Sequence, residues 1–102
     1  MLDFKISKTK KADTITFTVK GHLDYISVQE LAYELTTALE EEPTEIILNM
    51  TQVYSFCPTG TKALHSFKQT AQKSNCLFIL EHPSSVVINI IGKAELDMLM
   101  KI

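Results

Sequence analysis

Hydrophobic and polar residues alternate near the start of the chain, with the period of two that is typical of β-strands. This pattern predicts two strands that each bury one face. The apolar positions are Leu2, Phe4 and Ile6 in the first strand and Ile15, Phe17 and Val19 in the second. The polar segment 8–13 separates them, so we expect an antiparallel hairpin that ends in the segment 21–24.

The pattern then changes to the spacing of an amphipathic helix. One face of this helix is apolar, at Val28, Leu31, Ala32, Leu35 and Leu39. Ser27 and Glu30 have the spacing of a capping box, which predicts that Ser27 caps the helix. Ile26 and Leu31 have the spacing of a hydrophobic staple. Pro43 is expected to stop the helix, because proline cannot continue it.

The middle of the chain predicts a buried strand followed by a second helix. The segment 45–50 contains the apolar run Ile-Ile-Leu, which is typical of a strand buried on both faces. A second apolar stripe then follows at Ala63, Leu64, Phe67 and Ala71. Proline suits the first helical position, so we expect Pro58 there and Cys57 at the cap.

The last third of the chain predicts a buried strand over 75–80 and a short helix that begins near Ser84 and ends at Gly92. The final ten residues carry apolar side chains spaced by two, at Leu96, Met98, Met100 and Ile102. This spacing allows a last strand, but a helical turn is an equal alternative.

The predicted fold is α/β, in a single domain over 1–102, with the order β-β-α-β-α-β-α and a final strand left open. A helix lies between successive later strands, so these strands should be parallel and form a four- or five-stranded, mixed, mostly parallel sheet. Their carboxyl ends then share one edge of the sheet, where open α/β sheets bind ligands and partners. The residues expected at this edge are His22, Asp24, Cys57, Thr59, His82 and Ser84.

Composition excludes several classes of protein. Of the 102 residues 45% are hydrophobic and 22% are charged, which argues against disorder. No apolar run approaches the roughly 20 residues of a membrane span. The net charge is −2 and the chain has no arginine, which weighs against nucleic-acid recognition. The two cysteines have no CxxC spacing, so we expect free thiols in the cytoplasm.

Candidate catalytic and metal-binding residues are few. Cys57 at a helix start, with His22 or His82 as a base, would make a nucleophile and base pair. No oxyanion turn or orienting third group accompanies it, so we expect no enzymatic activity. The cysteines and histidines lack metal-ligand spacing, and the three separate glycines make no phosphate-binding loop. We therefore expect no cofactor and no metal.

Four pieces of the sequence together resemble one known family, the STAS domains or anti-anti-sigma factors. The segment 21–24, Gly-His-Leu-Asp, resembles the G-x-L-D element of that family, and 46–50 resembles its central VLDL strand. The segment 54–61 lies where the family has its F-x-D-S-S-G switch motif. The segments 85–88 and 91–92 are similar to its last helix and the small-residue turn after it.

The resemblance implies a sheet flanked by helices on one side, a regulatory role and no enzymatic activity. In the best-known branch, the domain binds a kinase-type anti-sigma factor, and the kinase phosphorylates the first serine of the motif. That serine is Pro58 in this chain, and the acidic residue before it is Cys57. The second serine is Thr59, which becomes the candidate phosphorylation site, while Asp24 and Gly60 match the family pattern.

Three hypotheses follow from these observations. The first is a divergent STAS interaction module that binds an anti-sigma factor, constitutively or under a switch at Thr59. The second is a regulatory subunit of a membrane transport system for lipids or anions, without membrane insertion of its own. The third is a thiol-based sensor or enzyme that uses Cys57. The partner-binding and switch residues would be Asp24, Cys57, Pro58, Thr59, Gly60 and Thr61, and we expect a monomer or a weak homodimer.

Overall fold

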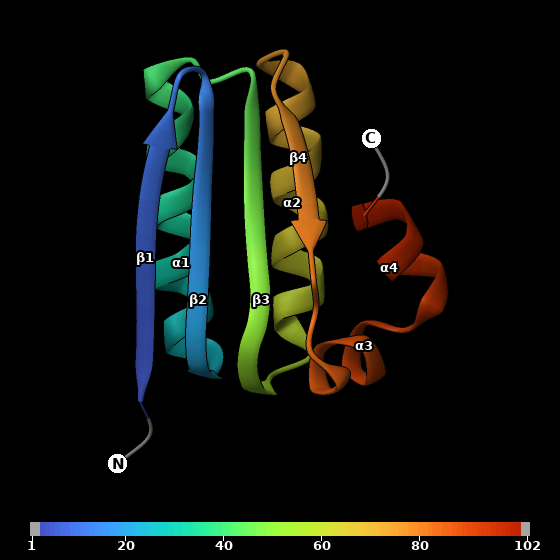
Figure 1. Ribbon diagram of the computed structural model, residues 1–102. Helices are drawn as coiled ribbons and strands as arrows, with labels where there is room; N and C mark the ends of the chain where they lie inside the picture. Colours follow the sequence, from blue (N-terminus) through green and yellow to red (C-terminus); the bar gives the residue numbers. More distant parts are fainter. Residues whose placement is uncertain (1–2, 101–102) are drawn as a thin grey trace.

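The computed structural model describes residues 3–100. Four strands form one sheet in the order β1-β2-β3-β4, in which β1 runs antiparallel to β2 and the other pairs are parallel (Figure 1). The elements are β1 (Phe4–Lys11), β2 (Thr14–Leu23), α1 (Tyr25–Ala38), the 3₁₀ turn η1 (Leu39–Glu41), β3 (Glu45–Phe56), α2 (Thr59–Lys73), β4 (Leu77–Glu81), α3 (Ser85–Ile91) and α4 (Lys93–Met100). This confirms the predicted α/β class and the mostly parallel sheet.

The hairpin of β1 and β2 forms as predicted, although its strands are longer than the alternation indicated. The turn is reduced to two residues, and Ala12 takes the left-handed backbone conformation there, with φ 54°. At the other end, Gly21 has φ 105°, and a Cβ atom on it would lie 2.1 Å from the carbonyl oxygen of Asp3. Glycine is therefore required where β1 and β2 approach most closely. The predicted strand position Leu2 lies outside the described residues.

Helices α1 and α2 cover one face of the sheet, as Figure 1 shows. The inward side chains of β2 and β3 pack beneath them and are at most 1% exposed, at Ile15, Phe17, Val19, Ile46, Leu48, Met50 and Val53. Burial of each such side chain contributes roughly 1.5–3 kcal/mol, so this layer is the main source of stability. The layer also fixes the ends of the strands, from which the loops of the candidate site begin.

The start of α1 differs from the prediction. Asp24, three residues before Ser27, is the N-cap, and Ser27 lies inside the first turn as its partner in the capping box. Ser27 is 6% exposed and also donates a hydrogen bond to the carbonyl of His22 at 3.0 Å. This hydrogen bond joins residues only five apart and connects the first turn of α1 to the end of β2. The predicted staple is also wrong, because Ile26 is 74% exposed.

Three further boundaries differ from the predictions. Strand β3 continues six residues past position 50 to Phe56, because register shifts let its polar second half stay paired with β2. Pro58 has helical φ and ψ but is the N-cap of α2, so Cys57 lies one residue before the cap. Strand β4 begins at Leu77, later than expected, and Cys76 precedes it as a buried residue.

The final segment is helical, which settles the alternative left open by the sequence. Helix α4 buries Leu96 and Leu99, three residues apart, while Met98 and Met100 are exposed. The spacing of two was therefore misleading, and no fifth strand occurs among residues 3–100. Glu95 of α4 lies 3.4 Å from Nδ1 of His65 on α2, which links the two helices. Ile102, the last residue of that pattern, lies outside the described residues.

Candidate functional site

The three parallel strands end at one edge of the sheet, and the loops after them lie together there (Figure 1). The N–H of Cys57 donates to the carbonyl of Leu23 at 2.9 Å, which joins the end of β3 to the end of β2. The N–H of Ser84 donates to the carbonyl of Met50 at 3.2 Å, which joins the start of α3 to β3. The structure thus places the residues predicted for this edge at the strand ends, loops and helix start that meet there.

The segment from Cys57 to Thr61 forms the first turn of α2 and its entry. The N–H of Gly60 donates to the carbonyl of Cys57 at 2.9 Å, and the N–H of Thr61 to that of Pro58 at 3.1 Å. No side chain caps this helix start. The N–H groups of Gly60 and Thr61 therefore have backbone acceptors but no side-chain cap, and the positive end of the helix dipole at this start favours a negative charge.

The hydroxyl groups of Thr59 and Thr61 differ in accessibility. Thr59 is exposed, and its Oγ1 lies 3.1 Å from Sγ of Cys57. Thr61 is half-buried, and its Oγ1 is fully buried with no hydrogen-bond partner among the described residues. Of these two hydroxyls, that of Thr59 is therefore accessible to a modifying enzyme.

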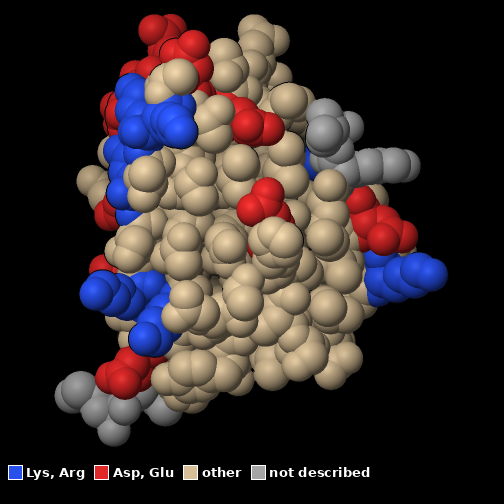
Figure 2. All heavy atoms as spheres, viewed as in Figure 1, with Lys and Arg blue, Asp and Glu red and all other residues tan. Residues whose placement is uncertain are grey.

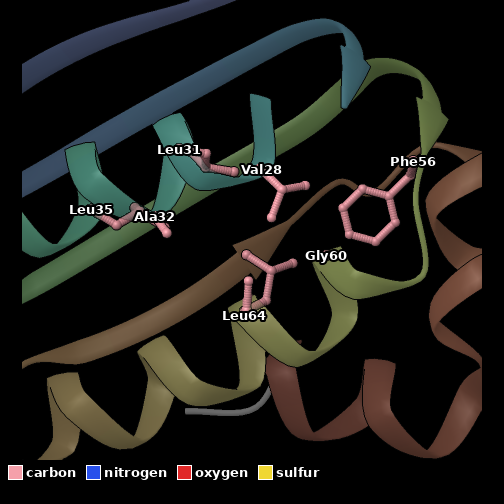
Figure 3. A pocket seen from close by; sticks show the side chains of 8 residues that line it. Val28, Leu31, Ala32, Leu35, Phe56, Gly60 and Leu64 are labelled. Carbon is pink, nitrogen blue, oxygen red and sulfur yellow. The ribbon is translucent and has the colours of Figure 1, made fainter. Parts of the chain in front are cut away.

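Gly60 is held against an aromatic ring. A Cβ atom on Gly60 would lie 2.4 Å from Cζ and 2.5 Å from Cε1 of Phe56. Figure 3 shows this ring beside Gly60, with Val28 and Leu64 pointing into the same space between α1 and α2. Glycine thus lets the last residue of β3 close the end of the core directly beneath the start of α2.

A small apolar cleft remains between α1 and α2 at this point (Figure 3). Its volume is about 10 Å³, and it is lined by Val28, Leu31, Ala32, Leu35, Phe56, Gly60, Ala63 and Leu64. Ligand pockets usually have roughly 300–1,000 Å³ and a few polar groups. This cleft is smaller and almost wholly apolar, so we assign it to core packing.

Asp24 is engaged in the cap of α1. Its Oδ1 accepts hydrogen bonds from the N–H of Ser27 at 2.9 Å and from the hydroxyl of Ser27 at 2.7 Å. The N–H of Ser27, followed by its hydroxyl, lowers the pKa of Asp24 from its ordinary value of 3.8. Asp24 is therefore an ionised structural residue of this edge, and its carboxylate is not free for catalysis.

The histidines of the edge do not contact Cys57. The ring of His22 packs edge-on against Tyr54, with centroids 4.2 Å apart. His82 lies 3.6 Å from the carboxylate of Glu81, and its carbonyl accepts a hydrogen bond from Thr51 at 3.0 Å. Since a catalytic thiol needs a base within hydrogen-bond reach, the described residues offer Cys57 no such partner. Burial raises the pKa of the other thiol, Cys76.

Sequence reasoning missed two residues that shape this site. Phe56 packs on Gly60, and Tyr54 lies edge-on against His22. A glycine in the first turn of a helix, four residues after an aromatic residue, is a signal that could have indicated the first contact. The second contact depends on the pairing of β2 with β3, which are far apart in the sequence, and the chain gives no local signal for it.

Among residues 3–100, no three histidine, cysteine or acidic side chains are placed to hold a metal ion. Within the same range, no helix is both long and apolar enough to span a membrane.

Comparisons with known proteins agree with this geometry. The family model of the STAS domain matches residues 5–102. The unphosphorylated anti-sigma factor antagonist SpoIIAA has 20% identity and a TM-score of 0.80, over 97% of this chain and 86% of that one. The phosphorylated Bacillus SpoIIAA has 19% identity and a TM-score of 0.75, over 97% and 89%.

A third similar structure is an anti-sigma factor antagonist from Mycobacterium paratuberculosis, with 14% identity, a TM-score of 0.74 and coverage of 96% of this chain and 83% of that one. Curated proteins gave no match. These structural likenesses, at low identity, show a shared fold, whereas the family model covers nearly the whole chain. The chain belongs to the STAS domain family.

Proposed function

We propose that this chain is a non-enzymatic regulatory module of the cytoplasm that binds a protein partner, a kinase-type anti-sigma factor, through the start of α2. The observation that carries the proposal is the segment Cys57–Thr61, which is uncharged and uncapped at the carboxyl edge of a STAS fold. The similar structures are anti-sigma factor antagonists, one of them in a phosphorylated form. Such a helix start can accept a phosphoryl group or dock a partner.

Regulation at this helix start would differ from the family pattern. Pro58 has no hydroxyl, so a phosphoryl group would have to be attached to Thr59, one residue later. Thr59 is exposed and lies in the first turn of α2, where the helix dipole stabilises an anion. A phosphoryl group there adds almost two negative charges to an otherwise uncharged contact surface, and this would weaken docking.

A pull-down from the source cell with wild type and Thr59→Glu tests the proposal, with bound proteins identified by mass spectrometry. We expect a kinase-type anti-sigma factor with wild type and at least a tenfold loss with Thr59→Glu. Thr70→Glu is the matched control, because Thr70 is exposed on the same helix but far from its start. Equal capture by all three proteins would contradict a switch at Thr59 and would indicate that the chain binds its partner constitutively.

Capture of a transporter ATPase in place of an anti-sigma factor would contradict the proposed partner. It would favour the alternative that the chain is a regulatory subunit of a membrane transport system. The same fold and the same loop could act in that role. The two outcomes are distinguished by the identity of the captured protein, so one experiment separates them.

A further inference from the structure

The face of the sheet opposite α1 and α2 carries no helix in the described chain (Figure 1). Side chains alternate along a strand, so the residues next to the buried ones point to this open face. They form rows across all four strands over residues 14–18 of β2, because the registers are continuous there and shift only beyond Thr18. Three of these rows are Lys11–Thr14–Glu45–Leu77, Thr9–Thr16–Ile47–Ile79 and Ser7–Thr18–Asn49–Glu81.

The two halves of the open face differ in polarity. On β1 and β2 its uncharged residues are serine and threonine, which suit a strand exposed to water. On β3 and β4 it carries Ile47, Ile79 and Leu77, of which Leu77 is 45% exposed. Parallel strands are usually covered on both faces, so apolar residues on this parallel half indicate a surface that another molecule covers.

The charges on the open face are also divided. Figure 2 shows a broad uncharged area with lysines along the β1 side and isolated acidic groups over the middle of the sheet; further acidic groups lie at the two ends of the β1 side. By register, the basic residues are Lys5, Lys11 and Lys20, and the acidic residues are Glu45 and Glu81. Among the described residues, these three lysines form no ion pair, whereas Lys8 and Lys10 on the other side of β1 both pair with Glu41.

We propose that the open face binds a second copy of this chain, by a two-fold axis that runs parallel to the strands. Such an axis places β1 of one copy over β4 of the other and reverses the order of each row. Thr14 then faces Glu45 of the other copy, and Lys11 is offset sideways from that residue by one strand spacing, about 4.8 Å, so its long side chain can reach the carboxylate. The apolar side chains of Ile47 and Ile79 pack on the threonine half of the other copy.

Charge selects this axis over the alternative. A two-fold axis perpendicular to the strands would place β1 over β1, and so would bring the lysines of the two copies together. Like charges opposite one another are destabilising, while the parallel axis sets each basic edge against an acidic one. The protein measures 34 × 30 × 19 Å, so its broad face is of the size of a standard interface, roughly 800 Å² per partner.

Sedimentation equilibrium of wild type, Lys11→Glu, Glu45→Lys and their combination tests the proposal. We expect a wild-type dimer in the micromolar range whose dissociation constant rises at least tenfold in each single variant. The combined variant should return to within threefold of wild type, because it exchanges the two charges. An equimolar mixture of the two single variants should also dimerise, since each supplies the charges that the other lacks.

Two controls keep the test specific. Lys73→Glu and Glu40→Lys make the same changes of net charge at exposed positions away from the open face, on α2 and η1, and should leave the dissociation constant unchanged. Circular dichroism verifies that each variant is folded. A wild-type protein that stays monomeric at 500 µM, or single variants that dimerise as wild type does, would overturn the proposal. Neither result bears on the start of α2, which lies at the edge of the sheet.

Discussion

Strands β2 and β3 both lead into a helix at the same edge of the sheet, but the two junctions are built differently. At the β2–α1 junction, the side chains of Asp24 and Ser27 each accept a hydrogen bond from the backbone N–H of the other residue, and so cap the first turn of the helix. At the β3–α2 junction, Pro58 offers no side-chain cap, and the helix start is held from beneath by the contact of Phe56 with Gly60. The first junction has a side-chain cap, whereas the second has none.

This difference separates a structural junction from one available for binding. A capped helix start has already used its N–H groups and cannot accept an anion without losing the cap. An uncapped start keeps its N–H groups for a ligand, provided that packing elsewhere holds the helix in place. In this chain Gly60 permits that packing, so we expect the two junctions to respond in opposite ways to substitution.

The largest effect is expected for Gly60→Ala. The added Cβ would lie 2.4 Å from the buried ring of Phe56, so the ring or the helix must move. We expect a loss of about 2–3 kcal/mol in the free energy of unfolding, measured by urea denaturation, despite the better helix propensity of alanine. Phe56→Leu in the same chain should recover part of this loss. A Gly60→Ala protein as stable as wild type would mean that the contact does not hold the second junction.

Ser27→Ala tests the first junction. The substitution removes a 6% exposed hydroxyl that accepts from the N–H of Asp24 at 2.9 Å and donates to the carbonyl of His22 at 3.0 Å. We expect a loss of about 1–2 kcal/mol in the free energy of unfolding, because buried polar groups lose their partners. Thr59→Ala, the corresponding deletion at the second junction, should change it by less than about 0.5 kcal/mol. Equal losses would erase the contrast between the junctions.

The first junction should also give the protein a specific sensitivity to acid. The folded state lowers the pKa of Asp24 from 3.8, so its contribution to stability is complete above that value and is lost as pH falls through the lowered value. Asp24→Asn, which can still cap, should be less sensitive to pH below about 3.8, as followed by unfolding at successive pH values.

Glu41 titrates in the same acid range, because hydrogen bonds from Lys8 and then Lys10 lower its pKa from 4.5. Glu41→Gln is therefore the control for the acid experiment. If the pH dependence of Asp24→Asn equals that of wild type while Glu41→Gln flattens it, the acid sensitivity belongs to η1 and β1 and not to the first junction.

The contrast between the junctions also explains what the sequence could and could not predict. Period-two alternation predicted β1 and β2 because one face of each is apolar. The sequence predicted the cap of α1 at Ser27, since Ser27 and Glu30 have capping-box spacing, but Asp24 and Ser27 have the same spacing, and the structure uses this earlier pair. Helix α4 was ambiguous because contacts outside the segment select Leu96 and Leu99 for burial.

For the candidate site, local rules placed Cys57–Thr61 at a helix start within one residue. Proline fixes the backbone there, and an apolar stripe follows it. The sequence could not distinguish the exposed hydroxyl of Thr59 from the buried one of Thr61, nor show that Phe56 lies against Gly60. These features depend on how α2 packs on β3, and no pattern within a single segment records such packing.

The substitution Thr59→Glu should have a small effect on stability, but it is the most specific test of the second junction. Thr59→Glu puts a carboxylate in the first turn of α2, beside N–H groups that no side chain caps. It should raise the free energy of unfolding by about 0.3–1 kcal/mol at low salt, measured by urea denaturation, because the helix dipole favours an anion there. Thr70→Glu, in the last turn of the same helix, should lower it by a similar amount.

Partner binding should fall with Thr59→Glu, so a protein that is more stable yet binds less would show that the open junction serves recognition at some cost to the fold. If Thr59→Glu is instead less stable than wild type, the N–H groups of this turn are not available to an anion, and a phosphoryl group on Thr59 would not be accommodated either.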